Sequence, residues 1–368
     1  MSLKKPDIYT LLLPLSFIYG FIVKVRNKLF DYNILKSRSF DIPVICVGNI
    51  SVGGTGKTPH TEYLIRLLKN EYEVNVLSRG YKRKSKGFVL AERGKTSIED
   101  IGDEPFQMWT KFTDIKVAVD SNRCNGIDNL IKLNISDSAN KVIILDDAFQ
   151  HRYVKAGMNI LLIDYNRPIH NDAILPAGRL RESQEGKKRA DIIIVSKCPE
   201  HMPEEDKAEF VKAISPTSGQ KVFFTGIKYD NLYNIFNHHQ IINLEDIDTD
   251  YDILLLTGIA SPKAIMELLK QHSGRLSSIT FSDHHNFSRE DLEKVSTKFK
   301  SINNIKKIIV TTEKDAARLI NDSNLDNDIK PYIFALPVNV YFLDNAESMF
   351  NHKITEYVRK NSRNSSLS

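Results

Sequence analysis

The sequence has few of the features that mark secreted, metal-binding and membrane-spanning proteins. It contains three cysteines in 368 residues, scattered in a way that fits neither a disulfide framework nor a zinc site, so a reducing compartment is indicated. Its most apolar uncharged run is shorter than the roughly 20 residues of a spanning helix. A hydrophobic fraction of 41% with 26% charged residues indicates a folded chain of about two domains.

The net charge of +5 is confined to the N-terminus. Residues 1–40 contain seven lysines and arginines against two aspartates, and the rest of the chain is formally neutral. A nucleic-acid-binding protein generally needs a broad basic surface, so we predict no nucleic-acid partner. One local contact with anionic groups is the better interpretation.

Between these basic residues lies the apolar run IYTLLLPLSFIYGFIV, residues 8–23, interrupted by Pro14 and Gly20. We predict that residues 1–40 associate with a membrane, lying in or dipping into it, with the flanking cations on anionic lipid headgroups. A signal peptide is disfavoured because no small-residue cleavage site follows. A buried first helix is the remaining alternative.

Short β-branched runs alternate with helical patterns through most of the chain. Those between residues 43 and 197 are continuously apolar, which is typical of strands buried on both faces. Helical stretches separate several of them, so the sequence predicts an α/β fold with a parallel sheet and helices on both faces.

A second, smaller α/β unit is predicted after residue 229, where the pattern restarts. Two further strands, at about 221–229 and 332–343, are expected to pair as a hinge between the units. The predicted division is a membrane-associating segment, a nucleotide-binding domain, a second lobe, and a C-terminal helix with a disordered tail, at residues 1–40, 41–220, 221–343 and 344–368. KNSRNSSLS, residues 360–368, is the expected disordered part.

A glycine-rich turn between a predicted strand and a predicted helix, 59–69, is the strongest single motif. SVGGTGKT resembles the phosphate-binding loop G-x-x-x-x-G-K-[ST], with a serine in place of the first glycine. Lys57 is expected to reach the β- and γ-phosphates of ATP, and the Thr58 hydroxyl to ligate Mg²⁺. The other predicted nucleotide contacts are Ser51, Val52, Gly53, Gly54, Thr55 and Gly56.

Paired acids follow the apolar strand in VIILDDAFQH. Asp146 and Asp147 are expected at the sheet edge where parallel sheets bind ligands, and there they would hold Mg²⁺. Adjacent strand residues project to opposite sides, so only one of the two can face the metal directly. Acids that merely cap a helix are the alternative.

Two other acidic groups are weaker signals taken alone. Asp103 and Glu104 in DIGDEPFQMW could simply cap a helix beginning near Pro105. In FSDHHNF, Asp283 beside His284 could fix the histidine tautomer and raise its basicity, although such groups are more often surface clusters.

Three basic loops suit phosphate recognition, because arginine binds phosphate through two parallel hydrogen bonds. They are SRGYKRK, DSNR and LPAGRLRES. The predicted substrate-binding residues on them are Arg79, Tyr81, Arg123 and Arg181. A solvated surface is the alternative for each loop.

Taken in order, these pieces resemble the tetraacyldisaccharide 4′-kinase family of lipid A biosynthesis. The resemblance runs from the N-terminus to about residue 345 and rests on VGNISVGGTGKTP, LSRGY, GDEP, DSNR, LDDAFQH, LPAGRLRE, DHHNF and TTEKDAARL. It implies a P-loop kinase that transfers phosphate from ATP to the 4′-hydroxyl of the tetraacyldisaccharide 1-phosphate precursor of lipid A. It also implies peripheral or monotopic attachment at the cytoplasmic face of the inner membrane, and no obligate protein partner is indicated.

The resemblance assigns roles to individual residues. It implies that Asp103 is the base for the sugar hydroxyl, that Glu104 contributes to the Mg²⁺ site, and that His284, next to Asp283, assists Asp103 from the other lobe. Arg123 and Arg181 would lie near phosphate or a lipid headgroup. One departure is Ala148, where the family motif often has glycine, and an alanine there loses only the freedom of positive φ.

Other classes of protein remain as alternatives. A membrane-associated P-loop ATPase acting as a switch is the strongest, although such loops carry an early lysine that Ser51 and Val52 do not supply. A GTPase would need VSKCP, residues 195–199, as its base-reading element, but the asparagine and aspartate of that element are missing. A non-enzymatic scaffold would tolerate loss of Lys57 and Asp103.

Overall fold

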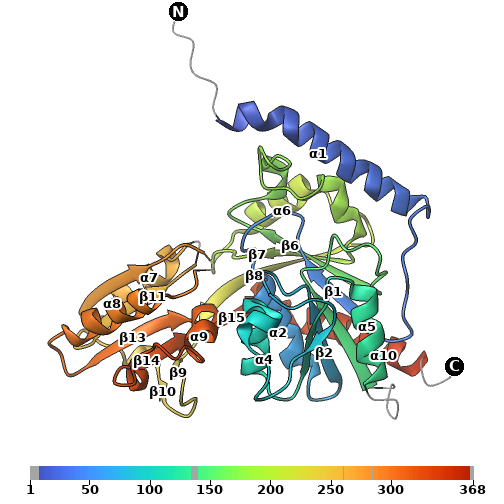
Figure 1. The fold of residues 1–368 in the computed structure, drawn as a ribbon. Helices are drawn as coiled ribbons and strands as arrows, with labels where there is room; N and C mark the ends of the chain where they lie inside the picture. The colour runs from blue at the N-terminus through green and yellow to red at the C-terminus, as the bar shows by residue number, and fades with distance from the viewer. Residues whose placement is uncertain (1–7, 134–139, 260, 284, 365–368) are drawn as a thin grey trace, which may run out of the picture.

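The computed structural model describes residues 8–133, 140–259, 261–283 and 285–364, so the predicted site residue His284 lies outside the described residues. Two mixed α/β units lie side by side, and a long N-terminal helix lies along one side of the larger unit (Figure 1). The larger sheet has nine strands in the order β15-β8-β7-β6-β1-β5-β2-β4-β3, and the smaller has six in the order β10-β9-β14-β13-β11-β12. The predicted fold class is therefore confirmed.

The larger sheet is parallel except at its edges, where β3 and β15 run antiparallel to their neighbours. Its strands are β1 (Val44–Gly48), β2 (Glu73–Ser78), β3 (Val89–Leu90), β4 (Lys116–Val119), β5 (Lys141–Asp146), β6 (Met158–Asp164), β7 (Ile192–Ser196), β8 (Lys221–Tyr229) and β15 (Val338–Phe342). The associated helices are α2 (Lys57–Leu68), α3 (Ile98–Ile101), α4 (Asp103–Lys111), α5 (Arg123–Lys132), α6 (Glu204–Ile214) and α10 (Glu347–Asn364).

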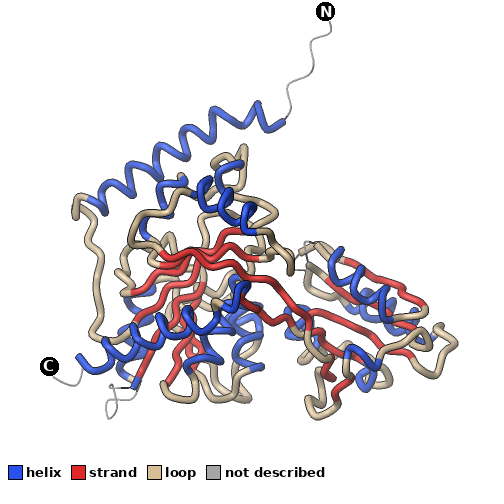
Figure 2. Tube along the Cα trace, turned by 180° about the vertical axis from the view of Figure 1, so that it is seen from behind, coloured by secondary structure: helices blue, strands red, loops and turns tan. Residues whose placement is uncertain are grey.

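Alternating side chains of the same strands fill two cores, one on each face of this sheet. Ile45 and Val47 of β1 join apolar residues of α2, α4 and α10, whereas Val44 and Cys46 join those of α5 and α6. Successive strand residues point to opposite faces, so a continuously apolar strand requires cover on both sides. Figure 2 shows α10 crossing one face of the strands.

The smaller unit is built around a sheet of β9 (Leu232–Asn234), β10 (Ile241–Ile242), β11 (Asp252–Thr257), β12 (Arg275–Thr280), β13 (Lys307–Thr312) and β14 (Ile333–Leu336). Its helices are α7 (Lys263–His272), α8 (Arg289–Lys300) and α9 (Glu313–Leu319). Short 3-10 turns occur in both units, at Ile169–Asn171, Gln184–Arg189 and Leu343–Asn345 in the larger and at Leu244–Asp246 and Lys330–Tyr332 in the smaller. The core again has two parts, one on either side of the sheet.

The connection between the units differs from the single long strand expected at 332–343. Pro337 separates β14, which pairs with β13 in the smaller sheet, from β15, which pairs with β8 in the larger one. Proline has no N–H to donate to a ladder, so an uninterrupted central strand is disfavoured there. Each of the two connections thus passes from one sheet directly into the other, through β8–β9 and β14–β15.

Helix α1 (Ile8–Asp31) contradicts the alternative of a buried first helix, because much of its apolar surface is exposed. None of the helices within the described residues is both long and apolar enough to cross a membrane. At the other end of the chain, α10 continues to Asn364, so the expected disordered tail is wrong for residues 360–364. Residues 365–368 lie outside the described part.

A buried ionic cluster joins α4 to α9 of the smaller unit. The Lys111 ammonium lies 2.6 Å from a carboxylate oxygen of Glu62 and 2.6 Å from one of Glu313. Both acids are buried, and the Val338 N–H at the start of β15 donates to Glu313. Burial and the nearby Glu62 raise the pKa of Glu313 to about 7. Arg66 also lies 3.6 Å from Glu62, so Lys111 compensates Glu313 and shares the compensation of Glu62.

Lys111→Met is accordingly expected to destabilise the fold by about 3–5 kcal/mol, because it leaves the buried Glu313 carboxylate without its cation. The free energy of unfolding would be measured by urea denaturation. Lys95→Met is the matched control, since Lys95 pairs with Glu92 on an exposed surface, where a pair contributes about 0–1 kcal/mol. Equal effects of the two substitutions would contradict the structural role of the cluster.

Candidate active site

The glycine-rich loop lies between β1 and α2, and α2 begins at Lys57, two residues before the helix expected from the sequence. Gly53 and Gly56 have φ of 104° and 81°, which only glycine adopts without strain. The serine that replaces the first motif glycine forms a bridge with Leu180, and the Val52 N–H donates to the Arg179 carbonyl at 2.8 Å. The start of the loop is thus fixed against segment 179–181.

A cavity of about 760 Å³ opens beside this loop. The predicted residues that line it are Val52, Gly53, Gly54, Lys57, Arg79, Tyr81, Glu104, Arg123, Asp147, Arg181 and Asp283. The remaining predicted residues with described positions do not line it, and they are Ser51, Thr55, Gly56, Thr58, Asp103 and Asp146. Loops that follow different strands of the sheet therefore converge on one cavity, as expected for the carboxyl edge of a parallel sheet.

Cations dominate the lining of this cavity. Six cationic side chains face three carboxylates, and four of the cations are arginines. The Lys57 ammonium lies 3.8 Å from Asp147, and the Arg181 guanidinium lies 2.9 Å from the same carboxylate. A cavity of this charge suits a ligand with phosphate groups, because guanidinium binds phosphate through parallel N–H bonds.

The adjacent acids at the end of β5 have different surroundings. Asp146 is fully buried and accepts hydrogen bonds from Thr61 and Ser78, at 3.3 Å each, whereas Asp147 lines the cavity. Burial, with Glu104 and Asp147 nearby, raises the pKa of Asp146 to about 7. Burial alone would raise the pKa of Asp147 too, but Lys57 and Arg181 outweigh it and hold that pKa below its usual value.

The backbone at Asp147 is itself unusual. Its φ of 45° is in the left-handed region, which costs a non-glycine residue about 1–3 kcal/mol. The bend turns Asp147 out of the strand direction and toward Lys57. It explains how two successive residues reach a polar interior and an open cavity.

The donor set beside the loop fits Mg²⁺ bound together with a nucleotide. Glu104 and Asp147 line the cavity and carry the carboxylate oxygens that Mg²⁺ prefers, whereas the other two predicted ligands, Asp146 and Thr58, do not line it. No group of three or more His, Cys, Asp or Glu side chains suited to a metal ion occurs within the described part of the chain. Mg²⁺ usually binds through one or two carboxylates, and phosphate and water supply its other ligands.

Helix α9 of the smaller unit forms ion pairs with two further predicted acids, Asp103 and Asp283. Arg318 forms an ion pair with Asp103, the first residue of α4, and also pairs with Asp315 at 2.9 Å. Lys314, one turn earlier, lies 2.9 Å from Asp283. The segment TTEKDAARL, which carries these cations, is therefore the part of the smaller unit that faces the cavity side of α4.

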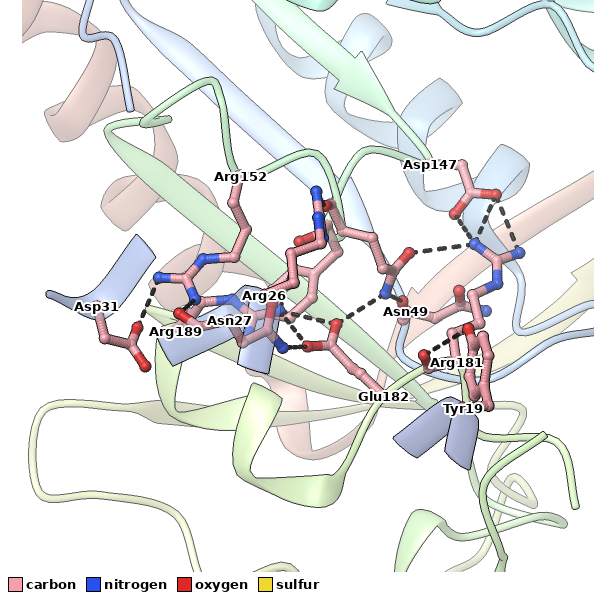
Figure 3. A network of polar contacts seen from close by, with 12 residues as sticks. Tyr19, Arg26, Asn27, Asp31, Asn49, Asp147, Arg152, Arg181, Glu182 and Arg189 are labelled. Atoms are coloured by element: carbon pink, nitrogen blue, oxygen red, sulfur yellow. Dashed lines mark hydrogen bonds and ion pairs between the residues drawn. The ribbon is translucent and has the colours of Figure 1, made fainter. Parts of the chain in front are cut away.

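The N-terminal helix contributes to the site through its polar side (Figure 3). The Tyr19 hydroxyl donates to the Arg181 carbonyl at 2.9 Å, and the Arg26 guanidinium donates to the Gln150 carbonyl at 3.2 Å. Asn27 donates to Glu182 at 3.0 Å, and Arg152 donates to the Asn27 carbonyl at 2.7 Å. Helix α1 is thus docked at the edge of the cavity by hydrogen bonds.

Seven lining residues were not predicted, and they are Tyr19, Arg26, Ser78, Ser121, Gln150, His151 and Lys314. Five lie within motifs of the resemblance, so motif membership was a usable signal for them. Burial and three nearby arginines, Arg123, Arg26 and Arg79, lower the pKa of His151 to about 4, which leaves it neutral at pH 7. Tyr19 and Arg26 gave no such signal, because their role depends on where α1 docks.

Comparison with known proteins decides the family. The model of the family tetraacyldisaccharide-1-P 4′-kinase, LpxK, matches residues 8–358. The chain belongs to this family. The tetraacyldisaccharide 4′-kinase of Phocaeicola vulgatus is 53% identical over 357 residues, which cover 97% of each chain. That of Bacteroides thetaiotaomicron is 50% identical over 368 residues, covering 98% of this chain and 96% of the relative.

A solved member of the LpxK family has the same fold. The crystal structure of LpxK from Aquifex aeolicus in complex with ATP has a TM-score of 0.73 and 30% sequence identity, and the match covers 96% of this chain and 100% of that one. The predicted family and enzyme class are thereby confirmed. The chain is an ATP-dependent kinase of lipid A biosynthesis that phosphorylates the 4′-hydroxyl of the tetraacyldisaccharide 1-phosphate, and none of these comparisons supports the alternative of an ATPase switch.

Proposed function

We propose that the cavity beside the glycine-rich loop is where the γ-phosphate of ATP meets the 4′-hydroxyl of the lipid. Residues 51–58 bind the phosphates, and the Lys57 ammonium neutralises charge on the β- and γ-phosphates. Two observations support this proposal. Lys57 lines the cavity, and its ammonium lies 3.8 Å from the Asp147 carboxylate, a contact that keeps the ammonium at the phosphate side of the loop.

In this mechanism Asp103, which begins α4 directly before the cavity residue Glu104, removes the proton from the 4′-hydroxyl. The hydroxyl oxygen forms a bond to the γ-phosphorus, the bond from that phosphorus to the β,γ-bridging oxygen breaks, and ADP leaves with the bridging oxygen. Asp283, which pairs with Lys314 of α9, and its sequence neighbour His284 are proposed to assist the base. When bound, Mg²⁺ supplies charge neutralisation on the phosphates, and Thr58, Glu104, Asp146 and Asp147 are the residues that would hold it.

We further propose that the arginines of the cavity bind the anionic part of the acceptor. Arg79 and Arg181 lie on separate loops and Arg123 begins α5, and all three line the same opening together with Tyr81. Three guanidinium groups can surround one phosphate from different directions, which orients the disaccharide as well as holding it. The 1-phosphate of the acceptor is the group that this arrangement fits.

Helix α1 is proposed to place the kinase on the inner-membrane surface, at its cytoplasmic face. Its polar side chains Ser16, Tyr19, Arg26 and Asn27 form hydrogen bonds to the larger domain. Most of its apolar side chains between Leu11 and Val25 face outward instead, and the exposed ones are Leu11, Leu13, Leu15, Phe17, Ile18, Phe21, Ile22 and Val25. This reverses the usual burial of apolar residues, and an exposed patch of this kind marks a membrane or protein contact.

We propose the domain division that the sequence predicted: a nucleotide domain at 41–220 and a second lobe at 221–343, with hinge strands at about 221–229 and 332–343. The hinge strands β8 and β15 pair within the larger sheet, and among the described residues the backbone passes to the smaller sheet beside Asp230 and Pro337, where the Asp230 N–H donates to the Pro337 carbonyl. Movement about this pair of crossings would bring α9 and the Asp283 loop against the acceptor and exclude water from it.

The deciding experiment is transfer of the labelled γ-phosphate of ATP to a lipid A disaccharide 1-phosphate in mixed micelles. The kinase mechanism predicts label in the lipid, with little free phosphate released without acceptor. Label only in free phosphate, at a rate that does not depend on the lipid, would instead indicate an ATPase and would overturn the proposed use of the cavity.

A further inference from the structure

Three successive carbonyl groups of the nucleotide loop are each held by a side chain from outside the loop. The Lys197 ammonium donates to the Gly54 carbonyl, and the Ser196 hydroxyl donates to the Thr55 carbonyl at 2.8 Å. The His60 ring nitrogen Nδ1 lies 2.7 Å from the Gly56 carbonyl. Two of these residues belong to the segment VSKCP, for which the kinase reaction provides no role.

The tautomer of His60 follows from its two partners. A carbonyl oxygen can only accept, so Nδ1 carries the hydrogen and donates to Gly56, and Nε2 accepts from the Thr225 hydroxyl 3.0 Å away on β8. His60 is buried, with one ring nitrogen at each of these two partners. A neutral ring with one donor and one acceptor satisfies both partners.

Lys197 is held in place by its own surroundings. Its ammonium also pairs with the buried carboxylate of Asp164 at 2.8 Å, and its backbone has a φ of 60°, which is strained for a lysine. Such strain persists where neighbouring contacts determine the conformation, and it clusters at functional sites. Ser196, immediately before it, is fully buried at the end of β7.

The planarity of the peptide bond gives these contacts a consequence for phosphate binding. In a trans peptide the C=O of one residue and the N–H of the next point in opposite directions. Fixing the carbonyls of Thr55 and Gly56 therefore directs the N–H groups of Gly56 and Lys57 to the opposite side of the loop. The Thr55 N–H itself donates to Gly53 at 3.1 Å, so the whole turn is held in one conformation.

We propose that Ser196, Lys197 and His60 are positioning residues that preset the nucleotide loop for ATP by holding its carbonyls. A glycine-rich loop without such contacts would lose backbone freedom when ATP binds, and that loss weakens affinity. The proposal assigns VSKCP to shaping the loop, in place of reading a base.

The test measures the dissociation constant for ATP and the KM for the lipid in Ser196→Ala and Lys197→Met. Each variant is expected to bind ATP about tenfold more weakly, as for the loss of one hydrogen bond to a preset site, with an unchanged lipid KM. Lys197→Arg, which keeps a cationic donor, should recover part of the affinity.

Lys207→Met is the matched control. Lys207 is another buried lysine with carboxylate partners, Asp344 and Glu204, but it does not contact the loop. It is expected to lower the melting temperature without changing ATP affinity. Unchanged ATP affinity in Ser196→Ala and Lys197→Met, or equal losses for ATP and lipid, would overturn the proposal. Ser196→Ala removes a single oxygen atom, so it keeps the test decisive if Lys197→Met fails to fold.

Discussion

Asp103→Asn is expected to reduce phosphate transfer to the lipid by about 10²–10⁴-fold, the range typical for loss of a general base. Asparagine keeps the shape of the side chain but cannot accept the proton of the 4′-hydroxyl. Asp103 begins α4 and pairs with Arg318 of the second lobe, so the substitution also weakens a contact between the lobes. The rate of labelled transfer and the affinity for ATP are measured together, and only the rate should fall.

Asp114→Asn serves as the control for the loss of an ion-paired carboxylate. Asp114 pairs with Lys69 at 2.9 Å and does not line the cavity, so transfer should stay within about twofold of the unsubstituted enzyme.

Lys57→Ala should also abolish transfer, by removing the cation at the phosphates. Transfer that survives both Asp103→Asn and Lys57→Ala, in folded protein, would refute the proposed roles.

The double substitution Phe17→Glu with Phe21→Glu is expected to weaken binding to anionic vesicles by about 100-fold. These side chains are 77% and 68% exposed on the outward side of α1, and burying one aromatic side chain contributes about 1.5–3 kcal/mol. Carboxylates also repel the anionic lipid surface. Binding would be measured by sedimentation with vesicles that contain an anionic phospholipid.

Ile305→Glu is the matched control for this change, because Ile305 is 99% exposed but lies in the second lobe. It should leave vesicle binding unchanged. The double variant should retain ATP binding, since neither phenylalanine lines the cavity. Full vesicle binding by the double variant would show that α1 does not mediate membrane contact, whereas an equal loss in Ile305→Glu would point to a general effect of charge.

The sequence predicted the elements whose pattern is local. The apolar strands between residues 43 and 197 alternate with helices, and this periodicity specifies a parallel sheet covered on both faces. The glycine-rich loop was equally readable, because SVGGTGKT lies between a predicted strand and a predicted helix, and in the structure Gly53 and Gly56 have positive φ. Even the acids Asp146 and Asp147 could be placed at the end of a strand by counting along the chain.

Contacts between distant segments could not be read from the sequence. The apolar run of α1 indicated a membrane, but only its docking shows that the polar residues Tyr19 and Arg26 face the protein and the apolar ones face outward. Likewise Pro337 was visible in the sequence, yet its effect depends on the two sheets that meet there.

The sequence by itself determined the family and the parallel sheet and predicted the chemical groups of the site, because these depend on local periodicity and on motifs of a few residues. Only the tertiary structure decided that Arg318 meets Asp103 across 215 positions of sequence, and that Lys197 and Ser196 hold a loop more than 140 positions away. Ion pairs and hydrogen bonds form between groups that folding brings within about 3 Å, and the order of residues along the chain does not specify such distances.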